Sequence, residues 1–467
     1  MQTLTLSLQR GKTPLYLQIY AALQQEIRTG RLQAGERLPG KRRLAADLSV
    51  SVNTVDTAYG MLAAEGYLQS VPRSGFVVCS VAAVPAAAAV PPSAPPSASP
   101  KSSFLYDFTT TSIDTSLFPF KTWRRLHQNV LSQQPDLLNH GERPGDEVLR
   151  RAIAAHLREH RAVSCGAHQV VVGAGMEYLL GLVARLFSGA CFAVENPGYS
   201  RTAHILQNNG AAVRFVELDE QGMSVDALSK SGADIAYITP SHQFPTGVTM
   251  PAARRYDLLA WARQAPGRYL IEDDYDSEFR FDSKPLPSLQ GMDAAERVIY
   301  IGTFSKSLAP AFRIAYIVLP QHLLARWNEE FGFYSCTVSR FEQHTLAQMM
   351  ENGQFAAHLR RLRLAYRRRR DLLTDALCRA FPDITLAGTH TGLHLLAQLP
   401  GCDDADILVQ TAAQHSVLCS SLSSYDAHTP RQTRAQVVLG YAGLSDDAIA
   451  SAVQRLSLAW NGAGTRS

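Results

Sequence analysis

A lysine, two hydroxyl residues and an arginine follow one of the apolar, β-branched runs of the chain. Lys306 comes shortly after Val298–Ile301, with Thr303 and Ser305 before it and Arg313 seven residues beyond it. A lysine amine at a strand end can capture an aldehyde, and hydroxyl groups and an arginine can neutralise a phosphate beside it. Pyridoxal phosphate carries both groups, so this segment predicts a site for that cofactor.

Two further segments supply what the cofactor's ring needs. Asp273 and Tyr275 stand two residues apart after another apolar run. A carboxylate keeps a pyridine nitrogen protonated, and a tyrosine hydroxyl can donate to a phenolic oxygen. The turn at Ala174, Gly175 and Met176 follows a third run and opens a helix, whose free N–H groups suit a phosphate. Each signal is weak alone, since solvated lysines, loop caps and glycine turns are common, but their joint order is specific.

An α/β body is needed to bring these residues together. The C-terminal part of the chain alternates short β-branched runs with helix-like patterns, among them Asp146–Glu159, Met176–Leu186 and Ala252–Arg263. The predicted strands are Gln169–Val172, Cys191–Val194, Val213–Leu218, Asp234–Thr239, Tyr269–Ile271, Val298–Ile301 and Arg313–Leu319. This alternation predicts a mostly parallel sheet, with ligands at the C-terminal ends of its strands.

From about residue 105 to 460 the chain resembles fold-type I pyridoxal-phosphate enzymes, the aspartate aminotransferase group, with a large and a small subdomain. The resemblance implies that Lys306 forms the Schiff base, that Asp273 pairs with the ring nitrogen and that Tyr275 donates to the phenolic oxygen. It implies phosphate contacts from Thr303, Ser305, Arg313 and the turn Ala174, Gly175, Met176. Tyr199, in ENPGY, corresponds to the ring that stacks on the cofactor, although a core tyrosine in a Pro-Gly turn remains an alternative.

All of the excess positive charge lies at the start of the chain. Residues 1–80 hold nine Lys and Arg against five Asp and Glu, and the rest of the chain holds 36 of each sign. Apolar residues repeat every four positions from Leu15 to Ile27, and two further helical patterns and a hairpin follow, with Ser51 as the N-cap of the third helix. Three helices and a hairpin predict a winged helix-turn-helix, and the charge predicts duplex DNA as its partner.

Residues 12–78 resemble the GntR-type DNA-binding domain, through LPGKRRLAADLSVSVNTVDTAYGMLAAEGYL and SGFVV. The resemblance implies that the third helix enters the major groove. Base or phosphate contacts then fall to Ser51, Asn53, Thr54 and Thr57, and phosphate contacts to Lys41, Arg42, Arg43 and Arg73. One departure weakens this set, because Val52 stands where relatives usually carry arginine. A three-helix module that binds protein is the alternative.

The segment between the two regions, residues 81–103, consists mainly of Ala, Pro and Ser. It has no periodic apolar face to bury, and its prolines lack backbone donors, so we expect a linker. The predicted organisation is a DNA-binding domain at 12–80, the linker at 81–103 and an aminotransferase-like domain at 104–462.

The fusion of the two domains resembles the MocR subfamily of GntR transcriptional regulators, through SLFPFKTWRR, TPSHQFPTG, IEDDYDSEFR and GTFSKSLAP. The resemblance implies a homodimer whose cofactor-binding domain senses an amine, an amino acid or pyridoxal phosphate itself. Arg201 matches a position that holds an effector carboxylate, and Arg431 or Arg434 offers a second cation. Each of these three arginines is equally consistent with a solvated surface residue.

Two departures distinguish the chain from a working aminotransferase. Phe244 stands where transaminases carry an asparagine for the phenolic oxygen, and Val438 stands where they carry an arginine for the substrate carboxylate. Loss of a bidentate clamp predicts slow or absent turnover. Two other functions remain open, a true aminotransferase with an accessory DNA-binding domain and a repressor whose large domain serves only to dimerise it.

Composition excludes several other classes of protein. No apolar run has the length of a membrane span and no secretory signal precedes the first helix, so we expect a cytosolic protein that joins the nucleoid when DNA-bound. Seven cysteines show no metal-finger spacing and predict free, buried thiols and no metal. An arginine-rich run at 360–370 overlaps leucines at helical spacing, which favours a long helix with a solvated basic face over a second DNA-binding surface.

Overall fold

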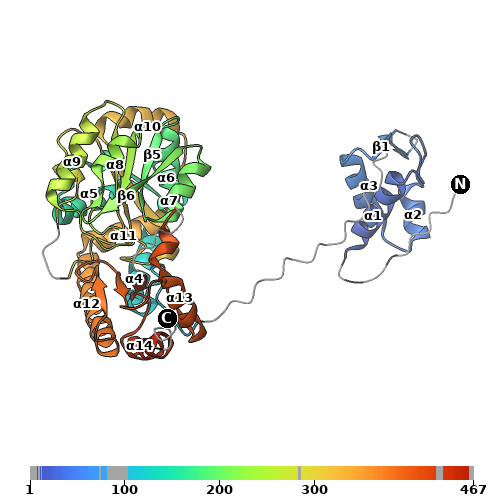
Figure 1. Ribbon diagram of the computed structural model, residues 1–467. Helices are drawn as coiled ribbons and strands as arrows, with labels where there is room; N and C mark the ends of the chain where they lie inside the picture. Colours follow the sequence, from blue (N-terminus) through green and yellow to red (C-terminus); the bar gives the residue numbers. More distant parts are fainter. Residues whose placement is uncertain are drawn as a thin grey trace. The chain divides into compact units, whose positions relative to one another are not determined.

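The chain forms two compact units, residues 1–101 and 102–467 (Figure 1). The computed structural model describes residues 8, 11, 13–72, 75–80, 104–281, 286–427 and 435–461. The predicted linker at 81–103 and three predicted site residues, Arg73, Arg431 and Arg434, lie outside these ranges.

The first unit is a three-helix domain with a two-stranded wing. Its elements are α1 Leu15–Arg28, α2 Lys41–Asp47, α3 Val52–Ala64, β1 Leu68–Val71 and β2 Gly75–Val78. The apolar residues that repeat every four positions on α1, namely Ile19, Leu23 and Ile27, are buried against the inner face of α3. The wing strands pair antiparallel. The predicted winged helix-turn-helix is therefore confirmed.

The turn between α2 and α3 is fixed by two local features. Ser49 has a left-handed backbone, with φ of +53°, which reverses the chain after α2. Ser51 caps α3, since its side chain accepts a hydrogen bond from the backbone N–H of Thr54. Together they set the angle at which α3 leaves the turn.

The second unit is built on an eight-stranded sheet in the order β4-β11-β10-β9-β8-β5-β6-β7. Its strands are β4 Val170–Ala174, β5 Cys191–Asn196, β6 Ala212–Asp219, β7 Gly222–Met223, β8 Ile235–Ile238, β9 Tyr269–Asp274, β10 Val298–Thr303 and β11 Ile314–Val318. The sheet is parallel except at β7 and β11, which run antiparallel to their neighbours. The predicted α/β architecture is confirmed.

Helices cover both faces of this sheet. On β10, Ile299 and Ile301 belong to the apolar cluster with α6 and α10, whereas Val298 and Tyr300 belong to clusters on the other face. The covering helices are α5 Glu147–Arg161, α6 Met176–Leu186, α7 Ser200–Asn208, α8 Val225–Lys230, α9 Ala252–Arg263, α10 Leu324–Phe331 and α11 Arg340–Glu351. A sheet buried on both faces explains why its strands are continuous apolar runs.

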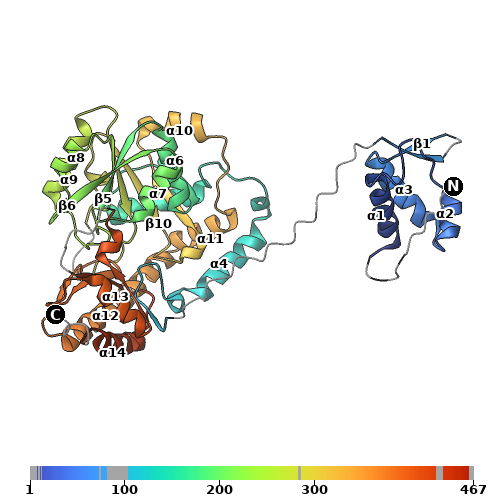
Figure 2. The same ribbon diagram turned by 45° about the vertical axis from the view of Figure 1, so that its right-hand side comes forward.

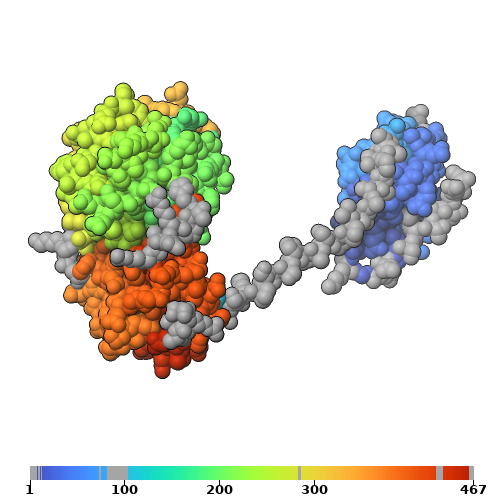
Figure 3. Space-filling view, in the orientation of Figure 1, coloured from blue at the N-terminus to red at the C-terminus, as the bar shows by residue number. Residues whose placement is uncertain are grey.

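The C-terminal part of the second unit is a smaller body that packs against the sheet body (Figure 3). The long helix α12 Gln354–Ala380 leads into a four-stranded antiparallel sheet of β12 Thr385–Ala387, β13 His394–Gln398, β16 Gln436–Gly440 and β15 Ser420–Ser421. Helices α13 Ala405–Gln414 and α14 Asp446–Asn461 cover it.

The start of the second unit is bound to this smaller body. Strand β3 Tyr106–Asp107 pairs in parallel with β14 Val417–Leu418, and helix α4 Phe120–Gln133 then packs on α11. Short 3₁₀ helices complete the elements, at Thr115–Leu117, Pro135–Leu138, Ala167–Gln169, Gln290–Met292, Pro310–Phe312, Gln321–Leu323 and Leu422–Tyr425. Among the described residues, no helix has the length and apolarity to span a membrane.

Two predictions about polar residues need correction. The arginine-rich run does lie on one long helix, but its basic residues are not all solvated: Arg369 and Arg370 are buried. Arg369 pairs with Asp114 and with Asp446, which joins α12 to the start of the unit and to α14. The seven cysteines are free, as predicted, but only Cys165 and Cys419 are buried.

We expect Arg369→Ala to destabilise the second unit by about 3 kcal/mol, because it leaves the Asp114 carboxylate without its buried cation. Arg368→Ala is the matched control. Arg368 also pairs with Asp446, but its side chain is 72% exposed, so its loss is expected to cost less than about 1 kcal/mol. Urea unfolding followed by tryptophan fluorescence measures both. Equal effects of the two substitutions would contradict the role of the buried pair.

Candidate functional site

A cavity of about 260 Å³ lies where the sheet body and the smaller body of the second unit meet. Figure 2 shows the orange and red C-terminal part packed below the green sheet body. The cavity brings together nine of the eleven residues predicted for the cofactor and for the role of Arg201, whereas Ala174 and Gly175 do not line it. The nine are Met176, Tyr199, Arg201, Asp273, Tyr275, Thr303, Ser305, Lys306 and Arg313. Residues that were not predicted also line the cavity, among them Thr110, Asp276 and His394.

Lys306 lies in the loop that follows β10, with its amine directed into this cavity. Its Nζ donates a hydrogen bond to the backbone carbonyl of Thr110, in the segment after β3. Burial lowers the pKa of Lys306 to about 8, opposed by the carboxylate of Asp276. A large fraction of such amines is neutral near pH 8, which is the nucleophilic form. No motif in the sequence marks Thr110 as a partner of this lysine.

Asp273 and Tyr275 come from the end of β9 and the residue after it. The Asp273 carboxylate accepts a hydrogen bond from the hydroxyl of Tyr237 on β8, and burial raises its pKa to about 7. The Tyr275 hydroxyl lies 2.9 Å from Nδ1 of His242, and burial raises its pKa well above 10. Tyr237 and His242 were not predicted, because each contact joins two different strands and no local spacing shows it.

The predicted phosphate residues gather at one end of the cavity. The hydroxyls of Thr303 and Ser305 are 2.9 Å apart, and Arg313 pairs with Glu177 at the start of α6. Gly175 has φ of +95°, and a Cβ there would lie 2.2 Å from the Arg313 guanidinium, so only glycine suits this turn. An anion needs hydrogen-bond donors. Arg313, which Glu177 holds in place, and the backbone N–H groups at the start of α6 can supply them.

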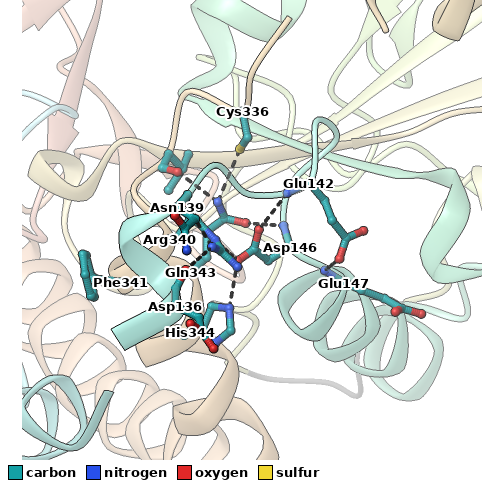
Figure 4. Close-up of polar contacts among 12 residues, drawn as sticks. Asp136, Asn139, Glu142, Asp146, Glu147, Cys336, Arg340, Phe341, Gln343 and His344 are labelled. Atoms are coloured by element: carbon teal, nitrogen blue, oxygen red, sulfur yellow. Dashed lines mark hydrogen bonds and ion pairs between the residues drawn. The ribbon is translucent and has the colours of Figure 1, made fainter. Parts of the chain in front are cut away.

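Ala174, the first residue of that turn, contacts a different part of the unit. Ala174 does not line the cavity, and its backbone N–H donates to the hydroxyl of Thr337 at 2.8 Å. Thr337 comes shortly before Arg340 and His344 in the sequence. Figure 4 shows the polar contacts around Asp146, whose carboxylate accepts hydrogen bonds from Arg340 and His344 at 2.8 Å each. Burial favours the neutral acid, but these hydrogen bonds outweigh it and lower the pKa of Asp146. The charged network fixes the loop beside the end of β4.

Tyr199 and Arg201 line the cavity together with Phe244. The Tyr199 ring meets the Phe244 ring edge to face at 5.7 Å, and the Arg201 guanidinium lies 6.0 Å from the Tyr199 ring. Phe244 is buried and offers no hydrogen-bond donor from its side chain. Val438 is a buried residue of β16. Of the predicted effector arginines, only Arg201 is among the residues that the structure describes.

The candidate DNA interface is the exposed side of α3 together with α2. Asn53 and Thr57 are exposed, but the Thr57 hydroxyl donates to the Asn53 carbonyl, and the hydroxyls of Ser51 and Thr54 bond to each other. Val52 is 42% exposed at the start of α3. The Asn53 amide is therefore the side chain of this set best placed to contact a base edge.

The three predicted basic residues of α2 differ in their surroundings. Arg42 and Arg43 are exposed, as phosphate contacts require. Lys41 instead pairs with Asp56 of α3, and its amine lies 5.1 Å from the ring of Phe76 in the wing. Its charge is therefore shared with a neighbouring carboxylate, which weakens the argument that it contacts a phosphate.

Comparisons with known families agree with this division into two parts. Residues 15–78 match the family described as bacterial regulatory proteins, gntR family, and residues 111–456 match aminotransferase class I and II. The chain belongs to the MocR-type GntR regulators. Members of that family combine these two domains, and the chain is accordingly a GntR-type regulator with an aminotransferase-like domain.

Individual relatives extend over nearly the whole chain. The chain is 38% identical over 452 residues to "Uncharacterized HTH-type transcriptional regulator YdeL" of Bacillus subtilis, covering 96% of this chain and 97% of that protein. It is 34% identical to "Probable rhizopine catabolism regulatory protein MocR" of Rhizobium meliloti, covering 96% and 94%. The multiple substrate aminotransferase of Thermococcus profundus superposes with a TM-score of 0.70 at 26% identity, covering 79% of this chain and 94% of that chain.

We expect Asn53→Ala to remove sequence preference on DNA while leaving most of the phosphate-dependent affinity, because base contacts specify and phosphate contacts position. Selection from a pool of random duplexes, followed by sequencing, measures the preference. Gln25→Ala, an exposed change on α1, is the control and should keep the wild-type motif. A motif unchanged in Asn53→Ala would contradict this use of α3.

Proposed function

We propose that this chain is a DNA-binding transcriptional regulator that holds pyridoxal phosphate on Lys306 and senses an amine. The observation that carries the proposal is the convergence, in one cavity, of a lysine with lowered pKa and the groups that each part of the cofactor needs. The residues come from four strand ends and the segment before α4. Convergence from so many parts of the chain is characteristic of a ligand site.

The donor set suits the cofactor atom by atom. Asp273 offers a carboxylate for the pyridine nitrogen, and that cation would return the raised pKa of Asp273 toward its ordinary range. Tyr275 offers a hydroxyl for the phenolic oxygen. Thr303 and Ser305, at and just after the end of β10, offer hydroxyl donors for the phosphate, and Arg313, which pairs with Glu177 at the start of α6, offers a guanidinium. When bound, the cofactor supplies an aldehyde that captures amines.

Lys306 and Arg201 would act on different groups of an effector that carries an amine. Lys306 in its neutral form would hold the cofactor through the aldehyde, and the same amine could take up a proton when it is not bonded to the cofactor. Arg201 lines the same cavity and can pair with a carboxylate on the incoming molecule. An amino acid offers both groups, so we infer an amino acid or a related amine as the effector, with pyridoxal phosphate itself as the other candidate.

The cavity favours binding over turnover. Phe244 stands where transaminases carry an amide for the phenolic oxygen, and Val438 stands where they carry a guanidinium for the substrate carboxylate. Neither side chain can donate a hydrogen bond. Regulation needs only different affinities of the effector for two conformations, which the remaining residues can supply. We infer a homodimer that presents two winged domains to two half-sites on DNA. A true aminotransferase stays the second candidate, since Lys306, Asp273 and Tyr275 are all present.

Borohydride trapping tests the covalent step. After incubation with pyridoxal phosphate and reduction, peptide mass spectrometry should place the cofactor on Lys306, and Lys306→Ala should take up none while remaining folded. DNA affinity measured with and without pyridoxal phosphate or γ-aminobutyrate then tests the sensor. A colourless wild-type chain would support a domain that only dimerises, and multiple turnovers with amino-acid donors and keto-acid acceptors would favour the enzyme.

The rate of cofactor uptake should depend on pH through Lys306. Because burial lowers the pKa of its amine to about 8, the neutral fraction, and with it the rate, should rise up to about pH 8 and then level off. An ordinary lysine would give a rate that rises until about pH 10.4. Stopped-flow absorbance measures the rate, with free Nα-acetyl-lysine as the reference for the cofactor's own ionisation. A profile identical to that of the reference would contradict the lowered pKa.

A further inference from the structure

His242, Asp276 and Tyr275 form a hydrogen-bonded chain beside the cavity that the proposed function does not use. His242 follows β8, and Asp276 follows Tyr275 in the loop after β9. Nδ1 of His242 lies 2.8 Å from a carboxylate oxygen of Asp276 and 2.9 Å from the hydroxyl of Tyr275. Both His242 and Asp276 are 1% exposed, so solvent does not compete for these contacts.

The Asp276 carboxylate decides which nitrogen of His242 carries the proton. Ionised, it accepts hydrogen bonds only, so Nδ1 facing it must be the N–H nitrogen. The opposite tautomer would place a lone pair against the carboxylate. It would also put a donor on Nε2, which is buried and has no hydrogen-bond partner among the described residues.

The same proton position fixes the hydroxyl of Tyr275. Nδ1–H points at both neighbours, so the Tyr275 oxygen acts as an acceptor toward His242 and its own hydrogen is left to point elsewhere. Tyr275 and Asp276 both line the cavity, which makes the cavity the available direction. Phe244, on the wall beside Tyr275, cannot supply a competing donor or acceptor from its ring.

We propose that His242, held by Asp276, is a positioning residue that directs the hydroxyl proton of Tyr275 into the cavity, toward the phenolic oxygen of the bound cofactor. This inference rests on the proposed function of the cavity. It explains how the chain serves that oxygen with Phe244 in place of an amide. The Tyr275 hydroxyl is therefore oriented as a hydrogen-bond donor before the ligand binds.

The surroundings supply the other charges that act on this chain. From β13, the His394 ring lies 4.6 Å from that of His242, and burial and His242 together hold the pKa of His394 well below 6.5. The His394 Nε2–H donates to the carbonyl of Pro245. The remaining titratable groups that face Tyr275 or His394 are Asp273, Asp274, Glu195 and Lys306.

A metal ion is the competing explanation for this cluster. His242, Asp276 and His394 each place one candidate ligand atom within 4.8 Å of the others. His242 Nδ1 carries the proton that it donates to Asp276, and a protonated ring nitrogen has no lone pair with which to bind an ion. The hydrogen-bonded arrangement therefore accounts for the geometry without an ion.

Two amide substitutions of His242 distinguish the contribution of Nδ1 from that of Nε2. The amide nitrogen of His242→Asn reaches the position of Nδ1, whereas that of His242→Gln reaches the position of Nε2. The readout is the pH at which the absorbance of the bound cofactor changes halfway, because a donor to the phenolic oxygen favours its deprotonated form. We expect His242→Gln to raise this midpoint by about one pH unit, a tenfold change in the equilibrium, and His242→Asn to leave it within a few tenths.

A double-mutant cycle ties the effect to Tyr275. Tyr275→Phe should raise the midpoint by at least as much as His242→Gln, and in that background His242→Gln should add nothing further. Equal midpoints in wild type and His242→Gln, equal shifts in His242→Gln and His242→Asn, or additive shifts in the cycle would overturn the inference. The inference would also be overturned if the purified protein held one equivalent of metal and removal of that metal by a chelator abolished the shift of the midpoint.

Two further outcomes separate this inference from the proposed function. A wild-type chain that forms no absorbing adduct on Lys306 would overturn both, whereas an adduct with unshifted variants would overturn the inference alone. Should the His242 variants fail to fold, selective ¹⁵N labelling of histidine in the wild type decides the matter. The ring must carry its proton on Nδ1, and a proton on Nε2 alone would refute the proposed orientation.

Discussion

Burial of charged groups at one end of a parallel sheet is the constraint on which the rest of the C-terminal unit depends. Asp274, next to the site, is buried and paired with Arg161, whose guanidinium also donates to the hydroxyl of Ser241 at 2.6 Å. Such a pair is stable only when its hydrogen bonds are satisfied, since an isolated buried charge is strongly unfavourable. Arg161 therefore compensates the buried charge of Asp274 at the end of the sheet that carries the cavity.

At this end of the sheet, burial shifts the pKa values of Lys306 and Asp273 in opposite directions. Burial lowers the pKa of Lys306 and makes its amine nucleophilic, and burial raises the pKa of Asp273, which a ligand cation would reverse. A pyridinium cation bound beside Asp273 would lower that pKa again and offset part of the cost of burying the carboxylate. In the proposed function, this gain is the free energy available to favour one conformation of the domain over another.

The DNA-binding unit is organised around an apolar core. Its core is a small set of mainly aliphatic residues from the three helices, the loop between α1 and α2, and the wing, together with Tyr59, and Ser51 caps α3. The capped start of α3 leaves Asn53 exposed, while nearby hydroxyls are already bonded to one another. Among the side chains predicted to contact bases, Asn53 is therefore the best placed, and Val52 is exposed beside it.

Sequence by itself determined the elements and their chemistry. Periodic apolar positions gave α1 and the strands of the large sheet, and residue types at strand ends pointed to Lys306, Asp273 and Tyr275, because these signals are local along the chain. The tertiary structure alone decided which groups meet across the sheet: Tyr237 with Asp273, His242 with Tyr275, Glu177 with Arg313, and Arg369 with Asp114. Those contacts join residues far apart in sequence, and nothing in the spacing of a single segment encodes the distance between two segments once they are folded.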